Sequence, residues 1–209
     1  MKKIILLAGL FFTAWFLSGC LKTLYPIFTE KDLVADPRLP GNWKKTKDGS
    51  TVTYRLANEN ELKVLSSTLQ RHAGTIYIKE EKDAQGNIES TLYAFMVKLG
   101  KYYYMDYYPI GIKETEKAGD FFAAHYIPMH SIYRIKFTAR NSFDLQQLDA
   151  GYLESLVKNK QIRIRHEIMD DSSFVITAPT KELQQYLIKY SDVPAAYNSD
   201  NSASYNRIN

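Results

Sequence analysis

The chemically richest stretch of the sequence is a run of seven residues, Tyr102-Tyr103-Tyr104-Met105-Asp106-Tyr107-Tyr108. Side chains alternate between the two faces of a β-strand, so one face would carry Tyr102, Tyr104, Asp106 and Tyr108. Aromatic walls with one acid suit a small apolar or aromatic ligand or a sugar. The alternative is that these rings pack in the core and across strands, with their hydroxyls at the rim. The preference of aromatic residues for strands favours this alternative.

Histidines offer a second kind of chemistry. His125 and His130 are five residues apart, and Asp106 and Asp120 are acids that a fold could bring near them. The spacing matches no common zinc-ligand pattern, and Pro128 between the histidines indicates a loop. We therefore predict no metal and no cofactor, and we expect a histidine at the entry to a strand that bonds the backbone.

Sequence signatures of catalysis are absent from the chain. It has no Gly-x-Ser-x-Gly elbow, no glycine loop of the phosphate-binding kind and no His-Glu-x-x-His. The adjacent carboxylates Glu80-Glu81 and Asp170-Asp171 border turns, and neighbours on a strand face opposite sides. They are interpreted as charges that aid solubility, and we do not expect an enzyme.

The only cysteine, Cys20, ends an N-terminal segment that has the three parts of a secretory signal. Two lysines are followed by an apolar run over residues 4–17 and then by small residues. That run is too short to cross about 30 Å of hydrocarbon, which needs roughly 20 apolar residues. The sequence therefore predicts a signal peptide over residues 1–19, cleaved between Gly19 and Cys20.

Leu17-Ser18-Gly19-Cys20 resembles the lipobox of bacterial lipoproteins. The resemblance implies that the Cys20 thiol receives a diacylglyceryl group and that the new amino terminus is acylated. Two or three acyl chains hold firmly, whereas one myristoyl chain binds with a constant of only about 10⁴ per molar. Lipidation would leave no thiol for disulfides, metal binding or catalysis. The alternative is ordinary signal cleavage that leaves a free thiol.

The resemblance to lipoproteins of Gram-negative type also implies an address. No aspartate follows the cysteine directly, which argues against retention in the inner membrane, and the acidic run of surface-displayed Bacteroidetes-type proteins is missing. We expect an envelope protein anchored in the outer membrane and facing the periplasm. A wider resemblance, to uncharacterised lipoproteins of Bacteroidetes-type bacteria, brings no activity with it. It rests on Leu24–Val34, Asp36–Trp43 and Thr177–Gln184.

Charge and composition divide the chain without indicating a charged ligand. The sequence has 27 Lys and Arg against 23 Asp and Glu, and the basic residues are scattered, so nucleic acid binding gains no support. Prolines and weak periodicity predict a lipidated tether over residues 20–41. One globular domain is expected over 42–190, and the Ser-, Asn- and Asp-rich residues 191–209 read as a disordered tail.

Alternation of apolar and polar residues predicts that the domain is mainly β. The segment 92–99 is apolar on both faces, and Gly100-Lys101 joins it to 102–108 as an antiparallel hairpin. Helical spacing predicts two short helices, one after Asp149 and one after Thr180. We expect an antiparallel meander of about eight or nine strands, which forms either a barrel or a strongly curved open sheet.

Gly41-Asn42-Trp43 resembles the Gly-x-Trp that opens the barrel of lipocalins and related calycins. In that family the tryptophan plugs one barrel end and stacks under an arginine from a late strand. The resemblance implies this role for Trp43, with Arg163 or Arg165 as the arginine. It also makes Trp43 a candidate ligand-binding residue, together with the four residues of the tyrosine strand. The chain departs from the family by placing a helix before its last two predicted strands.

Two readings of function remain open. The first is a structural or protein-interaction module of the envelope that meets a partner with its outer surface. The second is a binding module that holds a small apolar ligand inside a lipocalin-like barrel. An enclosed cavity near the tyrosine strand would favour the second, whereas a barrel filled with side chains would count against it.

Overall fold

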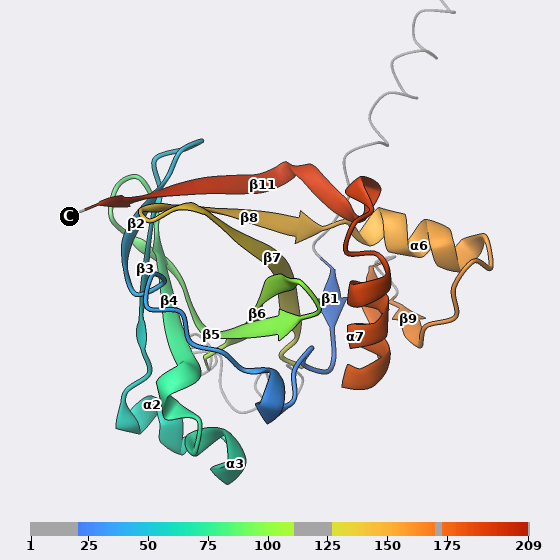
Figure 1. Ribbon diagram of the computed structural model, residues 1–209, viewed down its shortest axis with the longest axis horizontal. Helices are drawn as coiled ribbons and strands as arrows, with labels where there is room; N and C mark the ends of the chain where they lie inside the picture. Colours follow the sequence, from blue (N-terminus) through green and yellow to red (C-terminus); the bar gives the residue numbers. More distant parts are fainter. Residues whose placement is uncertain (1–20, 111–126, 170–172, 209) are drawn as a thin grey trace, which may run out of the picture.

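Eight antiparallel strands close into a barrel, so the fold is mainly β, as predicted, and is not an open sheet (Figure 1). The computed structural model describes residues 21–110, 127–169 and 173–208, without the side chains of 198–201. Each barrel strand pairs with the next along the chain, and the last strand pairs with both β8 and β2. The barrel strands are β2 (Gly41–Lys45), β3 (Thr51–Leu56), β4 (Ile76–Lys82), β5 (Ile88–Leu99), β6 (Tyr102–Pro109), β7 (His130–Ala139), β8 (Ser142–Leu148) and β11 (Tyr197–Ile208).

Three short strands extend the sheet beyond β7. They are β1 (Lys22–Thr23), β10 (Phe174–Ile176) and β9 (His166–Ile168). Strand β1 is antiparallel to β7 and parallel to β10. These strands gather with α6 (Ala150–Lys158) and α7 (Thr180–Lys189) on one side of the barrel, whereas α2 (Glu59–Lys63) and α3 (Ser67–Gln70) lie elsewhere on its wall (Figure 1). Single turns of 3₁₀ helix complete the fold at η1 (Glu30–Asp32), η2 (Ala73–Thr75) and η3 (Pro194–Ala196).

Both predicted helices are present. The side chain of Asp149 accepts a hydrogen bond from the Tyr152 amide at 2.8 Å and so caps α6. Helix α7 begins at Thr180, but Pro179 is its N-cap. The prediction of only two helices is wrong, because α2 and α3 form as well. They span five and four residues, too few for a helical repeat to be visible in the sequence.

The predicted disorder of residues 191–209 is wrong. Most of this tail forms β11, which closes the barrel between β8 and β2. Tyr205 is only 5% exposed and stacks on Phe143, with ring centroids 4.9 Å apart. The polar composition of the tail fits a strand whose outer face is wet and whose backbone bonds are satisfied on both edges.

The leader is more than a tether. Its first described residue, Leu21, is 1% exposed, and Ile27 and Leu39 are fully buried. Leu33 forms a β-bridge with Val97 on β5. The folded unit therefore includes residues 21–41 and does not begin at residue 42. The predicted signal peptide, 1–19, and Cys20 lie outside the described residues.

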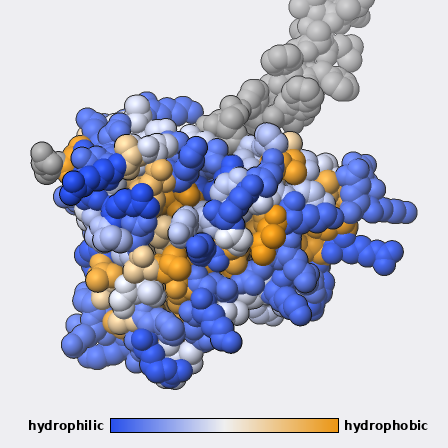
Figure 2. Space-filling view, viewed as in Figure 1, coloured by the Kyte–Doolittle hydropathy of each residue, from blue (hydrophilic) through white to orange (hydrophobic). Residues whose placement is uncertain are grey.

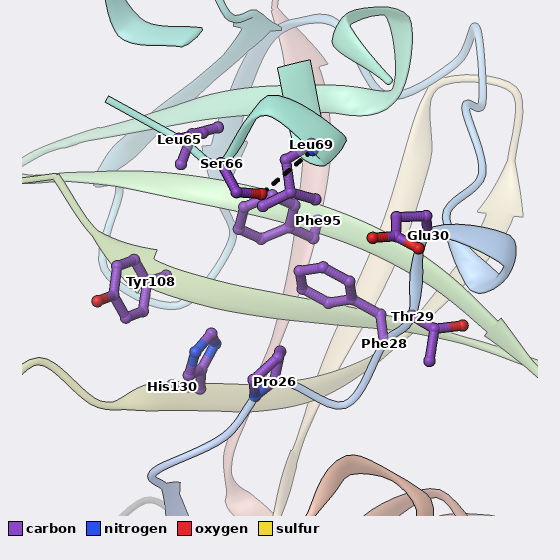
Figure 3. Close-up of a pocket in the computed structure, with 10 residues that line it drawn as sticks. All are labelled: Pro26, Phe28, Thr29, Glu30, Leu65, Ser66, Leu69, Phe95, Tyr108 and His130. Carbon is purple, nitrogen blue, oxygen red and sulfur yellow. Dashed lines mark hydrogen bonds between the residues drawn. The ribbon is translucent and has the colours of Figure 1, made fainter. Parts of the chain in front are cut away.

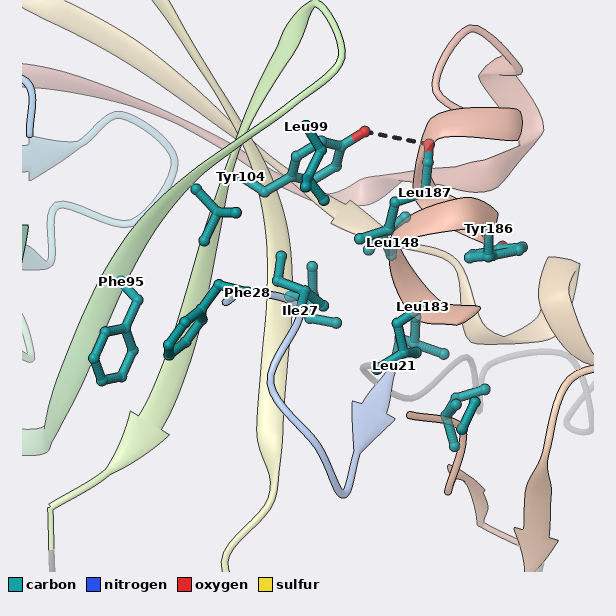
Figure 4. Packing of buried hydrophobic residues seen from close by; sticks show 14 of the residues in the cluster. Leu21, Ile27, Phe28, Phe95, Leu99, Tyr104, Leu148, Leu183, Tyr186 and Leu187 are labelled. Carbon is teal, nitrogen blue, oxygen red and sulfur yellow. Dashed lines mark hydrogen bonds between the residues drawn. The ribbon is translucent and has the colours of Figure 1, made fainter. Parts of the chain in front are cut away.

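Apolar side chains form two separate clusters, one inside the barrel and one outside it. Strand β5 divides them by alternation, since Ala94 and Met96 point inward while Phe95 and Val97 point outward. The inner cluster draws residues from all eight barrel strands. In the outer cluster, Leu183 and Leu187 of α7 meet the leader and the barrel wall (Figure 4).

Aromatic rings fill the barrel interior. Phe143 is fully buried and contacts both Trp43, at a centroid distance of 4.7 Å, and Tyr205. The hydroxyls of Tyr54 and Tyr107 are 2.6 Å apart, and both side chains are almost completely buried. At these distances the rings are in contact, so the protein's own side chains occupy the centre of the barrel.

One end of the barrel is built around Trp43. Its Nε1 donates to the Leu39 carbonyl at 2.9 Å, and the guanidinium of Arg207 lies 4.3 Å from its ring centroid. The arginine thus comes from β11, so the expectation of Arg163 or Arg165 is wrong. Gly41 is needed here because its φ is +136° and an added Cβ would lie 2.1 Å from Nη1 of Arg207.

Candidate functional site

The predicted alternation along β6 places Tyr102, Tyr104, Asp106 and Tyr108 on the outer face of the barrel. Their neighbours Met105 and Tyr107 belong to the inner cluster. The four side chains on the outer face do not form one site, because they divide into two pairs: Tyr102 and Tyr104 meet the C-terminal part of the chain, whereas Asp106 and Tyr108 both contact His130 of β7. Trp43, the other predicted ligand-binding residue, lies in the barrel interior and is separate from them.

Tyr102 and Tyr104 serve to attach the C-terminal part of the chain. The Tyr102 hydroxyl donates to the Asp192 carboxylate at 2.6 Å, and the Arg134 guanidinium lies 4.8 Å from its ring. The same guanidinium also lies over the Tyr197 ring, 3.6 Å from its centroid. Tyr104 is fully buried beneath α7, and burial raises the pKa of its hydroxyl.

Asp106 is fully buried in a position where the leader crosses the barrel wall. Its Oδ2 accepts from the Ile27 amide at 2.9 Å, and its Oδ1 lies 2.6 Å from Nδ1 of His130. Burial raises the pKa of Asp106, and the two hydrogen bonds oppose that rise only in part. A buried acid–imidazole pair therefore connects β6, β7 and the leader.

His130 is the first residue of β7 and is 8% exposed. A histidine at a strand entry was expected, but its side chain bonds Asp106 and not the backbone. Its ring also packs against Tyr108 in a tilted arrangement, at a centroid distance of 4.6 Å. The other residues considered for a metal site, His125 and Asp120, lie outside the described residues.

A pocket of about 310 Å³ opens beside this pair on the outer wall of the barrel (Figure 3). We call it the outer pocket. Its walls are mostly carbon and come from the leader, from the segment around α3 and from three barrel strands. The lining residues are Pro26, Phe28, Thr29, Glu30, Leu65, Ser66, Leu69, Phe95, Tyr108 and His130.

The leader side of the outer pocket is fixed by hydrogen bonds to α7 and β5. Thr180 donates through Oγ1 to the Pro26 carbonyl at 2.8 Å, and Gln184 donates to the Ile27 carbonyl at 2.9 Å. The Val34 amide donates to the Met96 carbonyl at 2.9 Å. Phe28 then packs on Phe95, with centroids 4.6 Å apart. This wall is preformed, because its backbone is bonded on both sides of the pocket residues.

The chemistry available in the outer pocket is that of binding. Ser66 caps α3, and its Oγ accepts from the Leu69 amide at 3.3 Å. On the leader side the lining also includes the side-chain oxygens of Thr29 and Glu30, which lie on the far side of Phe28 from His130 (Figure 3). The outer pocket thus combines apolar walls with one buried polar group, the imidazole of His130, and this combination is typical of ligand sites.

Sequence reasoning placed Asp106 and Tyr108 on one face but did not find their partner in the leader. The contact between Asp106 and His130 could have been predicted from the pairing of β6 with β7. Asp106 pairs with Ile132 across the β6–β7 hairpin, so His130 is its diagonal neighbour on the same face. The contact with Ile27 spans 79 residues and had no local signal.

Within residues 21–110, 127–169 and 173–208, no group of three or more His, Cys, Asp or Glu side chains could hold a metal ion. The helices in the same ranges are too short or too polar to cross a membrane.

Comparison of the chain with protein-family models, with curated proteins and with solved structures returned no match. The geometry of the barrel and of the outer pocket is therefore the basis for assigning a function.

Proposed function

We propose that this chain is a lipid-anchored protein of the cell envelope that acts as a protein-interaction module. In this proposal Cys20 carries the acyl chains, and the domain faces the periplasm from the outer membrane. The outer wall of the barrel then meets an envelope partner. The observation that supports the proposal best is the location of free space: aromatic rings fill the barrel, whereas the outer pocket opens outward.

The link between anchor and pocket gives further support. The leader starts directly after Cys20 in the sequence and supplies Pro26 and Phe28 to the pocket wall. An anchoring segment that is also part of a recognition surface would orient that surface relative to the membrane. The stacking of Arg207 on Trp43 supports, in addition, a proposed kinship of the barrel with lipocalins and calycins.

The alternative function, a small apolar ligand held inside the barrel, has less support. Such a ligand would need the space that Phe143, Tyr205 and Trp43 fill. Small-molecule sites usually occupy 300–1,000 Å³, roughly, and displacing three packed rings would cost several kcal/mol. A ligand on the outer wall remains compatible with the geometry.

The anchoring part of the proposal is tested by Cys20→Ser in the native host. The variant should lose labelling by a radioactive fatty acid and move from the membrane fraction to the soluble fraction. Gly19→Ala, which keeps a small residue before the cysteine, is the matched control and should remain labelled. If the serine variant stays bound to membranes as firmly as the natural protein, the anchoring proposal is wrong.

The interaction part is tested by photocrosslinking in intact cells. A photoreactive amino acid at Leu69, on the pocket rim, should capture a defined envelope protein. The same amino acid at Lys136, which is exposed on the outer face of β7, is the control and should not capture that protein. Equal capture from both positions, or none from Leu69, would contradict the proposal.

A further inference from the structure

The outer pocket has aromatic walls of a size that suits one ring. Phe28 and Phe95 form one side, and Tyr108, packed against His130, forms another (Figure 3). The volume of about 310 Å³ is roughly twice the 150 Å³ or so that encloses benzene in an engineered protein cavity. Aromatic walls favour an aromatic guest through offset and edge-to-face contacts. The pocket therefore fits one substituted ring better than a long aliphatic chain.

The imidazole of His130 is held in one orientation by Asp106. Nδ1 of His130 is committed to the Asp106 carboxylate, 2.6 Å away, which leaves Nε2 as the ring nitrogen that can meet a guest. His130 is more than nine-tenths buried and lines the pocket. A buried histidine is thus positioned by a second buried group, which is the arrangement that fixes a ligand's polar atom.

The proton count of the pair selects the guest's polar atom. A fully buried pair is least costly when it is neutral overall, with the proton shared between Asp106 and Nδ1, and Nε2 then carries a hydrogen to donate. If the pair loses one of these two protons, the remaining proton lies on Nδ1 beside the carboxylate, and Nε2 becomes an acceptor. A hydroxyl group can accept a hydrogen bond from Nε2–H through its oxygen or donate its O–H to bare Nε2, so it matches both states.

Charge at the site excludes an anionic guest. Burial already disfavours the Asp106 carboxylate, and Glu30 adds a second carboxylate to the lining. A guest carboxylate would likewise lose its hydration in an apolar pocket, whose lining already includes the Glu30 carboxylate. The guest's oxygen should therefore be neutral.

We infer that the outer pocket binds a neutral phenol group, held between its aromatic walls with the hydroxyl on Nε2 of His130. The inference names the chemistry recognised by the proposed interaction module and rests on that proposal. A tyrosine side chain of a partner protein and a free small phenol would both present this group.

The test uses the full natural chain in lipid nanodiscs and a phenol that carries a photoreactive diazirine. Mass spectrometry should locate the label on peptides that contain residues 26–30 and 65–69. 4-Ethylphenol should compete about fivefold better than ethylbenzene, as expected for one net hydrogen bond, and 4-ethylbenzoate should compete worst. Labelling outside the pocket, or equal competition by the phenol and ethylbenzene, would overturn the inference.

Two variants separate recognition from folding. His130→Phe should remove the advantage of ethylphenol over ethylbenzene while ethylbenzene still competes. Because that change leaves Asp106 without its partner, Leu69→Trp is the second variant. It alters a half-exposed rim residue and should block labelling by filling the pocket, with an unchanged circular dichroism spectrum. Full labelling of a folded Leu69→Trp protein would also overturn the inference.

The source of the phenol is resolved by peptides. A blocked tripeptide with a central tyrosine should compete with the label if the group belongs to a partner protein, and its phenylalanine analogue should compete about fivefold less well. Competition by ethylphenol but not by the tyrosine peptide would assign the site to a small phenol. Phenol binding without capture of a partner from Leu69 would refute the interaction module alone, whereas capture without phenol binding would refute this inference alone.

Discussion

Replacing Arg207 by alanine should remove the connection between the last strand, the leader and the tryptophan at the barrel end. The guanidinium lies 4.3 Å from the Trp43 ring and donates to the carbonyls of Pro40, at 2.9 Å, and Arg38. Trp43 itself is fully buried, so its indole cannot turn to solvent when the cation is lost. One substitution thus breaks contacts to three residues, two in the leader and one in β2.

The size of the effect follows from these contacts. A cation over an aromatic ring contributes about 0.5–2 kcal/mol, depending on how far it is desolvated. A hydrogen bond from a charged donor contributes roughly 1.5–3 kcal/mol when buried, and the part-exposed position of Arg207 argues for the lower end. We expect Arg207→Ala to lower the free energy of unfolding by about 3 kcal/mol. For a chain of this size, the Tm should fall by roughly 6–12 °C.

Trp43 supplies the assay. The sequence has two tryptophans, Trp15 and Trp43, and removal of the predicted signal peptide leaves Trp43 as the only one. Its fluorescence during urea unfolding then reports on the same end of the barrel. Arg163→Ala is the control, because Arg163 is exposed and should change stability by less than about 0.5 kcal/mol. If Arg207→Ala is no more destabilising than Arg163→Ala, the stacking carries none of the stability argued for it.

Three other perturbations test the same physical picture. Gly41→Ala should destabilise the fold by about 2 kcal/mol or more in the same urea-unfolding assay. The φ of Gly41, +136°, is unfavourable for alanine, and the new Cβ would collide with the guanidinium of Arg207. Unchanged stability would contradict the need for glycine at this position. Asp106→Ala should lower the free energy of unfolding by about 3 kcal/mol and speed proteolytic cleavage of the leader, because the Ile27 amide and the paired imidazole lose their acceptor. A leader as resistant to cleavage as in the natural protein would contradict the role of Asp106 in fixing the leader. Burial raises the pKa of Tyr54 well above 10, so the unfolded chain releases this proton first and stability should fall as pH rises above about 10. Tyr54 alone should contribute a loss of roughly 1.4 kcal/mol per pH unit, and the other buried tyrosines add to it. The absorbance of phenolate should rise as the protein unfolds at high pH, and Tyr54→Phe should make the free energy of unfolding depend less steeply on pH. An equally steep dependence in the variant would refute the role of Tyr54.

Local pattern predicted much of the barrel because its strands follow one another along the chain. Alternation identified the two faces of β5 and β6, and Gly100, with φ +58°, makes the tight turn between them. The capped helix after Asp149 was equally visible. Each of these features is set by residues within a few positions of one another, which is the range over which sequence periodicity carries information.

The closing strand escaped prediction for a physical reason. Among its described side chains, Ala203 and Tyr205 join the inner cluster and Arg207 covers Trp43, while the remaining composition is that of a polar loop. Its stabilisation comes from backbone pairing with β8 and β2, strands that lie about 60 and 160 residues earlier in the chain. Backbone hydrogen bonds of this kind leave no pattern in the side chains, so the polar composition of residues 191–209 led to a prediction of disorder.

The outer pocket depends on contacts of the same long range, and this bears on how the protein would work. Pro26 lies six residues after Cys20, and six extended residues span at most about 22 Å. If Cys20 is acylated as proposed, the pocket therefore stays within about that distance of the point where the acyl chains leave the protein. The leader cannot slide to lengthen this connection, because Asp106, Thr180 and Gln184 bind its backbone at Pro26 and Ile27. A partner that places a phenol ring in the pocket must then present it close to the membrane surface, which makes proteins embedded in or bound to the same membrane the first candidates for capture from Leu69.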